Sequence, residues 1–253
     1  MTKRKPSRTR GAVVTSILLF LGGRSATPAT PPSTQKILDG AEDARIGGLR
    51  SFVFDVKITD EAATGPRATT NYQVFIKGAE RTLIKFADPS DKGKLLLTVE
   101  DNMWLYLPAT SRPVRVTPLQ KLWGAASNGD VGATDFAIQY SGNVVGEETL
   151  DGKPAWVLEL AAKRKSATYS TVRYWVAKQD LIPLQAELRL ASDKPSKLTR
   201  FEEFEKVGGK RFLKRQVIID LLRRNQKTVL EFSNYRQREI PDRFFNKNYL
   251  GEL

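Results

Sequence analysis

Residues 172–190 read VRYWVAKQDLIPLQAELRL, and this stretch decides the fold. Apolar side chains recur at every second position on both sides of a turn-like segment, 179–183, which ends in proline. This period is typical of β-strands with one buried and one wet face. The two runs therefore predict a pair of antiparallel strands, with apolar positions Val172, Tyr174, Val176, Leu184, Ala186, Leu188 and Leu190.

The same period extends outward along the chain, at 52–57, 72–77, 95–99 and 156–160. Asp151-Gly152 and Gly208-Gly209 are strong signals for two-residue hairpin turns. Helical patterning is confined to 35–45, 118–126, 134–139 and a short turn at 242–245. Successive strands joined by short turns predict one antiparallel sheet with too few helices to cover its apolar face.

A strongly curved sheet solves this problem. We therefore expect a mainly β chain whose antiparallel sheet forms an unclosed β-barrel, or half-barrel, with a few short helices as a lid. Such a shape leaves an apolar cavity, and the cavities of barrels commonly hold small apolar ligands.

The composition excludes several kinds of chemistry. The 253 residues contain no cysteine and no histidine, so disulfides, thiol catalysis, a Ser-His-Asp triad and a histidine-ligated zinc site are ruled out. The net charge is +13, of which six positive residues lie in the first 24, so their removal leaves +7. A basic protein favours anionic partners, although a solvated basic surface has the same composition.

The N-terminus has the order of a secretory signal peptide. A basic stretch, 1–10, is followed by the apolar run GAVVTSILLFLGG at 11–23 and then by small residues and prolines. The apolar run is short for a bilayer span, which needs about 20 residues. We expect a signal peptide at 1–29, cleaved after Ala29, and a single domain at 30–253; an uncleaved amphipathic anchor is the alternative.

Five further segments carry a family resemblance. Residues 102–112 read NMWLYLPATSR, residues 132–136 read GATDF, and residues 174–184 read YWVAKQDLIPL. Residues 227–232 read KTVLEF, and DRFF at 242–245 is followed by Tyr249-Leu250. In this order, from about residue 35 to the end, the segments resemble the outer-membrane lipoprotein-sorting proteins, the group of the periplasmic lipoprotein carrier. Ala133-Thr134 stands where Gly-Ser is more usual in that family, which affects the expected cargo more than the fold.

The resemblance implies an unclosed β-barrel with a helical lid over an apolar cavity, and a periplasmic role in moving lipid or lipoprotein acyl chains towards the outer membrane. It also implies possible work beside an RND-type exporter or an outer-membrane acceptor. We expect transient membrane contact, no nucleic-acid partner, no cofactor and no metal. The oligomeric state stays open.

Two sets of side chains are candidates for binding. An apolar pocket suffices for an acyl chain, because each buried CH₂ contributes about 0.8 kcal/mol. Arg112 and Arg115 flank a proline-containing turn that leads into the expected lid helix. They are candidates to contact a lipid head group or a partner, although a solvated edge is the more ordinary explanation. The candidates for the cavity lining, each of which could instead be an ordinary core residue, are Trp104, Tyr106, Trp123, Phe136, Trp156 and Tyr174.

The sequence does not decide which face of the strand that contains Trp104 lines the cavity. Trp104 and Tyr106 share one face of their strand, while Met103 and Leu105 share the other, and only one face can line the cavity.

Other charged groups argue against catalysis. Glu147-Glu148 and Glu202-Glu203 are neighbours on strands, so the two carboxylates of each pair point to opposite faces and do not converge. The basic clusters 163–165 and 223–224 have no interleaved aromatic residues for base stacking and fit a membrane surface or a solvated turn.

We therefore expect a non-enzymatic periplasmic carrier that binds lipid or lipoprotein acyl chains, shielded by 118–140. The alternative is a lipid-sensing or adaptor module that binds an envelope protein. A hydrolase of an envelope polymer is a third hypothesis, which the missing histidine disfavours.

Overall fold

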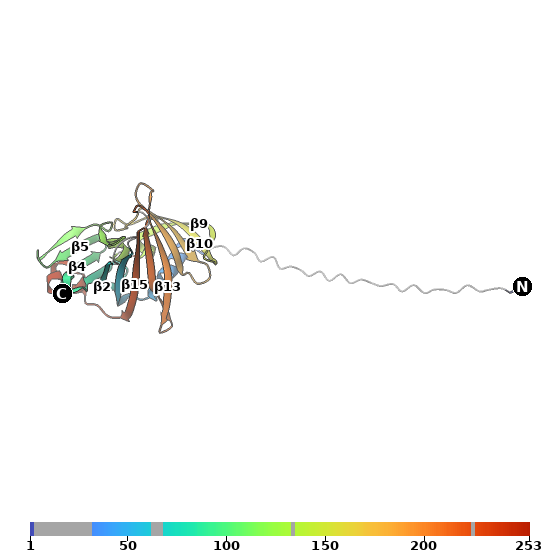
Figure 1. Ribbon diagram of the computed structural model, residues 1–253. Helices are drawn as coiled ribbons and strands as arrows, with labels where there is room; N and C mark the ends of the chain where they lie inside the picture. The colour runs from blue at the N-terminus through green and yellow to red at the C-terminus, as the bar shows by residue number, and fades with distance from the viewer. Residues whose placement is uncertain (3–31, 62–67, 133–134, 224–225) are drawn as a thin grey trace. The chain divides into compact units, whose positions relative to one another are not determined.

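The period-two segments of the sequence form the strands of one large sheet (Figure 1). The computed structural model describes residues 1–2, 32–61, 68–132, 135–223 and 226–253, and residues 32–253 form one unit. The predicted signal peptide lies almost entirely outside the described residues.

Thirteen strands of the described chain pair antiparallel in the order β6-β5-β4-β3-β2-β1-β15-β14-β13-β12-β11-β10-β9. The edges are β6 and β9, so the sheet is an open barrel, as the sequence predicted. The strands are β1 (Ser51–Glu61), β2 (Ala68–Lys77), β3 (Arg81–Phe86), β4 (Leu95–Val99), β5 (Asn102–Leu107), β6 (Arg112–Val116), β9 (Tyr140–Leu150), β10 (Lys153–Ala162), β11 (Thr171–Ala177), β12 (Pro183–Arg189), β13 (Pro195–Val207), β14 (Lys210–Asp220) and β15 (Gln226–Gln237).

The remaining elements are short and lie against the two faces of this sheet. A separate hairpin consists of β7 and β8. The bounds are α1 (Thr34–Ile46), η1 (Pro89–Asp91), β7 (Lys121–Trp123), β8 (Ala126–Ser127), α2 (Asn128–Gly132), α3 (Phe136–Gln139), η2 (Asp242–Phe245) and η3 (Lys247–Glu252). Within the described residues, no helix is both long enough and apolar enough to cross a membrane.

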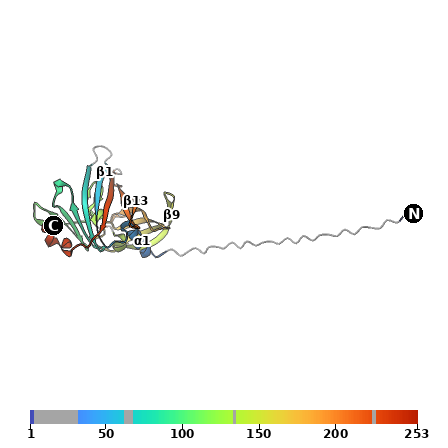
Figure 2. The same cartoon turned by 90° about the horizontal axis from the view of Figure 1, so that it is seen from below.

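Local sequence explains where α1 begins and ends. The Ser33 side chain accepts a hydrogen bond from the backbone N–H of Lys36 at 3.3 Å, and Gly47 ends the helix with a left-handed φ of 65°. The predicted apolar stripe of this helix is buried. Figure 2 shows α1 inside the curve of the sheet, where it packs on β14, β9 and β12.

Both predicted hairpin turns are confirmed. Asp151 and Gly152 have φ values of 49° and 76°, and Gly208 and Gly209 have 57° and 78°. Positive φ at both central residues matches the twist of the flanking strands.

The helix expected at 118–126 is wrong, because this segment forms a turn and the β7–β8 hairpin. Gly124 has a φ of 55°, which interrupts a helix, and the N–H of Ala125 donates to the hydroxyl of Thr228 at 2.7 Å. Tertiary contact therefore overrides the local helical pattern. The helix expected at 134–139 is present as α3 from Phe136, capped by the Asp135 side chain; Thr134 lies outside the described residues.

The two faces of the sheet have separate cores. The inner face carries two large apolar clusters that include α1 and residues of the segment between β6 and β9. The outer face carries a third cluster, in which β1–β5 pack against the C-terminal residues Ile240, Phe245 and Leu250. The C-terminal turns lie beside β4 in Figure 1.

Candidate functional site

The inner face of the sheet is covered by α1 and by residues 117–140, which we call the lid segment; its residues 133–134 lie outside the described chain. The lid supplies buried apolar groups to both inner clusters, among them Ala126, Val131 and Ala137. An apolar sheet surface is thus closed off by a segment that is not part of the sheet.

A buried ion pair joins the lid to the sheet. The ammonium of Lys197 on β13 lies 2.6 Å from the Asp130 carboxylate on α2, and the two side chains are only 12% and 5% exposed. The second Asp130 oxygen accepts a hydrogen bond from the Tyr169 hydroxyl at 2.8 Å. The backbone N–H and hydroxyl of Ser127 both donate to Asp130 at 2.8 Å.

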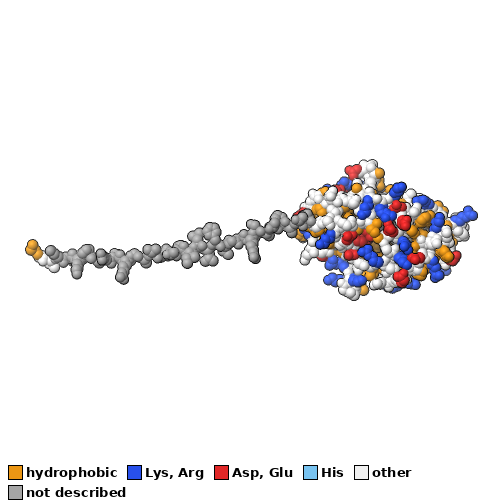
Figure 3. All heavy atoms as spheres, turned by 180° about the vertical axis from the view of Figure 1, so that it is seen from behind, with side chains coloured by type: hydrophobic (Ala, Val, Ile, Leu, Met, Phe, Trp, Pro, Cys, Tyr) orange, Lys and Arg blue, Asp and Glu red, His pale blue; other side chains and the backbone are white. Residues whose placement is uncertain are grey.

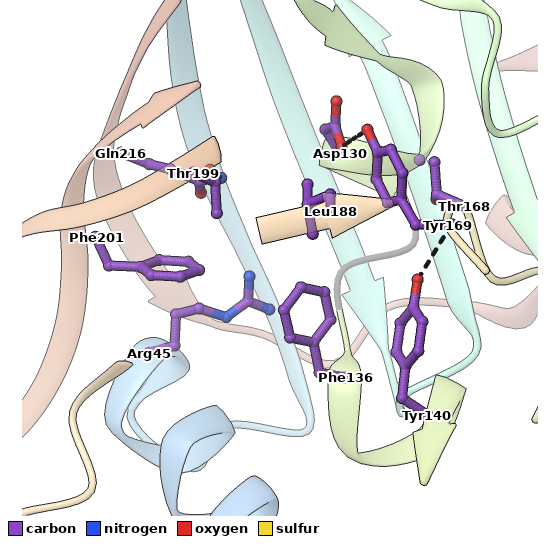
Figure 4. A pocket seen from close by; sticks show the side chains of 11 residues that line it. Arg45, Asp130, Phe136, Tyr140, Thr168, Tyr169, Leu188, Thr199, Phe201 and Gln216 are labelled. Atoms are coloured by element: carbon purple, nitrogen blue, oxygen red, sulfur yellow. Dashed lines mark hydrogen bonds between the residues drawn. The ribbon is translucent and has the colours of Figure 1, made fainter. Parts of the chain in front are cut away.

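This network is well satisfied. Burial raises the pKa of Tyr169, so its hydroxyl stays protonated and donates at neutral pH. The Tyr140 hydroxyl accepts from the N–H of Tyr169 at 3.2 Å, which links the start of β9 to the same network (Figure 4).

A second polar pair lies on α1. Glu42 and Arg45 are both buried, with 2.6 Å between carboxylate and guanidinium. Burial raises the pKa of Glu42 to about 7, and the Arg45 charge opposes that shift. Burial also raises the pKa of Asp135, the N-cap of α3. Figure 4 shows the Arg45 guanidinium reaching from α1 toward the ring of Phe136 on the lid.

Two small cavities of about 30 Å³ each lie in the interior of the described part of the chain. Arg45, Asp130 and Gln216 line both. A volume of this size accommodates about two waters, whereas pockets for small ligands measure about 300–1,000 Å³. The structure is therefore a closed state of the interior.

Phe136, Tyr174 and Trp156, three of the candidate lining residues, lie together in one inner cluster. Phe136 lines a cavity and meets Tyr140 and Tyr174 edge to face at 5.3 and 5.1 Å between ring centres. Trp123 packs on the other inner cluster from the β7–β8 hairpin. Their contact with cargo stays a proposal.

Trp104 and Tyr106 lie elsewhere. They pack in the outer cluster against the C-terminal turns, and Met103 and Leu105 of the same strand face the inner core. The structure thus puts the two aromatic residues on the face opposite the cavities. Alternation in the sequence identifies the two sets but not which set faces inward.

Arg112 and Arg115 are exposed on the edge strand β6. Arg115 donates to the side-chain oxygen of Asn102 at 2.5 Å. On the face shown in Figure 3, side chains of both charge signs are interspersed with apolar ones.

The adjacent carboxylates diverge, as expected. Glu148 accepts hydrogen bonds from Arg173 and Trp175, both at 2.8 Å, whereas Glu147 pairs with Lys178. Among the described residues, no group of three His, Cys, Asp or Glu side chains could hold a metal ion.

One basic cluster has a structural role that the sequence did not reveal. Arg164, in the loop after β10, pairs with Glu80 and, at 3.2 Å, with Asp101. These acids lie in the turns after β2 and β4, so Arg164 ties together segments from distant parts of the sheet. In the second cluster, Arg223 is exposed and Arg224 lies outside the described residues.

Sequence reasoning missed the polar centre of the interior, formed by Asp130, Lys197 and Tyr169. One signal was present: Lys197 shares its strand face with Thr199 and Phe201, so the period-two pattern directs it inward. Nothing in the sequence alone identifies Asp130 as its partner, because 67 residues separate them.

Comparisons with known proteins agree on the fold. A family model described as an uncharacterized protein matches residues 78–252. The chain is 30% identical to a LolA superfamily protein from Nitrosomonas europaea, with a TM-score of 0.80 over 86% of this chain and 99% of the other. No curated protein matches the chain.

Two further solved structures are similar. A DUF1329 family protein from Desulfovibrio piger is 25% identical, with a TM-score of 0.73 over 87% of this chain and 100% of that one. A putative outer membrane lipoprotein-sorting protein domain from Vibrio parahaemolyticus is 20% identical, with a TM-score of 0.72 over 86% and 97%. The last likeness bears on the fold alone.

Proposed function

The chain belongs to the LolA superfamily, and from this premise we propose that it is a periplasmic carrier that encloses the acyl chain of a lipid or lipoprotein between the inner face of its sheet and the lid segment. The signal-peptide pattern at 1–29 supports export. The direction of transport we propose is towards the outer membrane.

One observation carries this proposal: the two apolar clusters on the inner face of the sheet are covered by α1 and the lid, which are not strands of the large sheet. A cover of this kind can move away without breaking the sheet ladder. The exposed apolar face would then bind an acyl chain at about 0.8 kcal/mol for each buried CH₂.

Binding requires the lid to open, because the closed interior has cavities of only about 30 Å³. The polar contacts that must be released include the Asp130–Lys197 pair, the Asp130–Tyr169 hydrogen bond and the hydrogen bond from Ala125 to Thr228. Trp123 also donates to the carbonyl of Ala68, and Lys163 donates to the carbonyl of Ala137. Displacement of Phe136 and Val131 would join the two cavities into one acyl site.

The role needs no catalytic group. We propose Phe136, Tyr174, Trp156 and Trp123 as acyl contacts, since they line or adjoin the inner clusters. Arg112 and Arg115 on the exposed edge β6 are the proposed contacts for a membrane head group or an acceptor protein.

Native mass spectrometry of the protein purified from the periplasm, with lipid extraction of the same sample, tests the proposal. We expect bound lipid or lipoprotein at about one per chain. A clean apo mass, together with no uptake of an added fluorescent fatty acid, would contradict the carrier and leave a protein-binding adaptor.

A matched pair of variants sharpens this test. Phe136→Ala removes a ring from the inner side and should weaken uptake of the fluorescent fatty acid about tenfold. Trp104→Ala removes a ring from the outer face and should lower the free energy of unfolding by about 2 kcal/mol with unchanged uptake. The reverse pattern would place the acyl site on the outer face.

A further inference from the structure

The interior contains a buried cation whose partner belongs to the movable cover. Lys197 and Tyr169 belong to the sheet and its connecting loop, whereas Asp130 and Ser127 belong to the lid segment. Asp130 is the only carboxylate within 4.0 Å of the Lys197 ammonium among the described residues. Opening of the lid therefore takes the negative charge away from Lys197.

An ammonium left without a partner in an apolar interior is strongly unfavourable. The ammonium is already nearly closed off from solvent, since the Lys197 side chain is 12% exposed. An acyl chain that fills the space beside it would remove more water. A neutral cargo would leave this charge buried and unpaired.

A polar group without a partner among the described residues lies next to this ion pair. The Thr168 hydroxyl is buried and has no hydrogen-bond partner within the described part of the chain. It lines the cavity of about 30 Å³ together with Asp130, Tyr169 and Gln216. Gly129 of the lid packs directly against it, since a Cβ atom there would lie 1.9 Å from the Thr168 hydroxyl oxygen.

Lid opening would therefore uncover three groups at one site: the Lys197 ammonium, the Tyr169 hydroxyl and the Thr168 hydroxyl. All three can donate a hydrogen bond. Lys197 and Tyr169 hold the Asp130 carboxylate in the closed state, and Figure 4 shows the hydrogen bond from Tyr169. Donors grouped in this way are suited to an oxyanion.

We infer that the cargo is an acyl chain bearing an anionic group, a carboxylate or a phosphate, which replaces the Asp130 carboxylate on Lys197 and Tyr169 when the lid opens and also accepts a hydrogen bond from Thr168. This inference rests on the proposed carrier function and names the class of its cargo. The lid carboxylate acts as the internal substitute for the cargo anion in the closed state.

Titration calorimetry of the mature chain at pH 7.5 tests this inference with four probes: palmitate, methyl palmitate, hexadecyl phosphate and inorganic phosphate. Palmitate and its methyl ester share the chain and differ in charge. We expect palmitate and hexadecyl phosphate to bind at least tenfold tighter than the ester, which is about the contribution of one charge-assisted hydrogen bond. Inorganic phosphate should give no measurable binding.

Variants assign the preference to the site. Lys197→Met should bring palmitate and its ester to equal affinity, and Lys197→Arg should keep the preference. Lys57→Met is the matched control, because Lys57 pairs with Glu231 at 3.3 Å on the exposed surface. Should Lys197→Met fail to fold, Tyr169→Phe removes one donor and should weaken palmitate several-fold with the ester unchanged.

The outcomes separate the two proposals. Equal binding of palmitate and its ester to the natural chain would overturn the inference and leave the carrier intact. No binding of any long-chain probe would overturn both. Inorganic phosphate binding as tightly as hexadecyl phosphate would identify a free-anion site and also overturn the inference.

Discussion

The Asp130–Lys197 pair should hold the lid closed, and a double-mutant cycle measures by how much. Breaking a buried ion pair by removing one partner typically destabilises by about 3–5 kcal/mol. In Lys197→Met, Asp130 keeps three donors, from the N–H and hydroxyl of Ser127 and from Tyr169, all at 2.8 Å. We therefore expect a smaller loss, about 2–3 kcal/mol in the free energy of unfolding.

In Asp130→Asn the Lys197 ammonium stays buried and loses its only carboxylate within 4.0 Å among the described residues, so we expect a loss of about 3 kcal/mol. The double variant leaves neither charge unpaired. Its loss should be smaller than the sum of the two single losses by about 2 kcal/mol, which is the coupling energy of the pair. Urea denaturation of the four proteins gives these values.

Hydrogen exchange tests the location of the effect. The amide of Ala125 in the lid donates to the hydroxyl of Thr228 on the sheet, so its exchange reports lid opening. A loss of about 2 kcal/mol should speed it roughly thirty-fold. The exposed pair Lys57–Glu231 is the control and should show a coupling below about 1 kcal/mol. Additive single losses, or unchanged lid exchange, would refute the pair as a latch.

Three further predictions concern residues outside the Asp130–Lys197 pair. Burial raises the pKa of Glu42 to about 7 and also raises that of Asp135, so the folded state binds more protons than the unfolded state. The free energy of unfolding should therefore fall as the pH rises from about 4.5 to 7. Glu42→Gln should flatten this pH dependence in urea titrations, and an unchanged slope would show that other groups cause it. Gly142→Ala puts a Cβ 2.0 Å from the backbone oxygen of Glu159 and should lower the free energy of unfolding by about 2 kcal/mol. In Gly146→Ala, on the same strand, the new Cβ meets nothing within 4 Å, so thermal stability should change little. Equal effects of the two variants would show that the backbone moves to relieve the close approach at Gly142. Arg164→Met removes the ion pairs with Glu80 and Asp101 and should lower the free energy of unfolding by about 1 kcal/mol at low salt and by less at 0.5 M salt. A loss that does not depend on salt would contradict the ionic explanation.

The carboxylates with a lowered pKa do not interfere with the first of these three measurements. Hydrogen bonds from Asn71 and Ser166 lower the pKa of Asp88 and Asp101, so both titrate below the ordinary range of an aspartate. Their contribution to stability is lost only as the pH falls through that lower range. Between pH 4.5 and 7 the sign is set by the raised groups.

The sequence predicted the strands, the turns and the start of α1 because each of these elements is determined by residues close together in the chain. The cap at Ser33, the turn at Asp151-Gly152 and the period-two strands depend on residues close in sequence. The hairpin at 121–127 could not be read in this way, because its conformation depends on Thr228, which is about 100 residues away.

The candidate site was predictable only in part, for a similar reason. Phe136 and Tyr174 were predicted as lining residues because aromatic side chains are typical of cores and cavities alike, and the two residues lie in one inner cluster. The choice between Trp104 and Met103 depends on which face the C-terminal turns cover, and that is a property of the whole sheet. The pairing of Asp130 with Lys197 requires the lid to cross the sheet, which no strand pattern encodes.

The polar centre affects how the proposed carrier would release its cargo. A lid pair that contributes about 2 kcal/mol lowers the population of the open state about thirty-fold, and a neutral ligand that binds only this state binds correspondingly more weakly. An anionic cargo would offset this loss, because it pairs with Lys197 while Asp130 is displaced. Release would follow the reverse exchange, in which Asp130 competes for Lys197 from within the same chain. A lid held by apolar contacts alone could close on any acyl chain, but this one would close most readily once the cargo anion leaves.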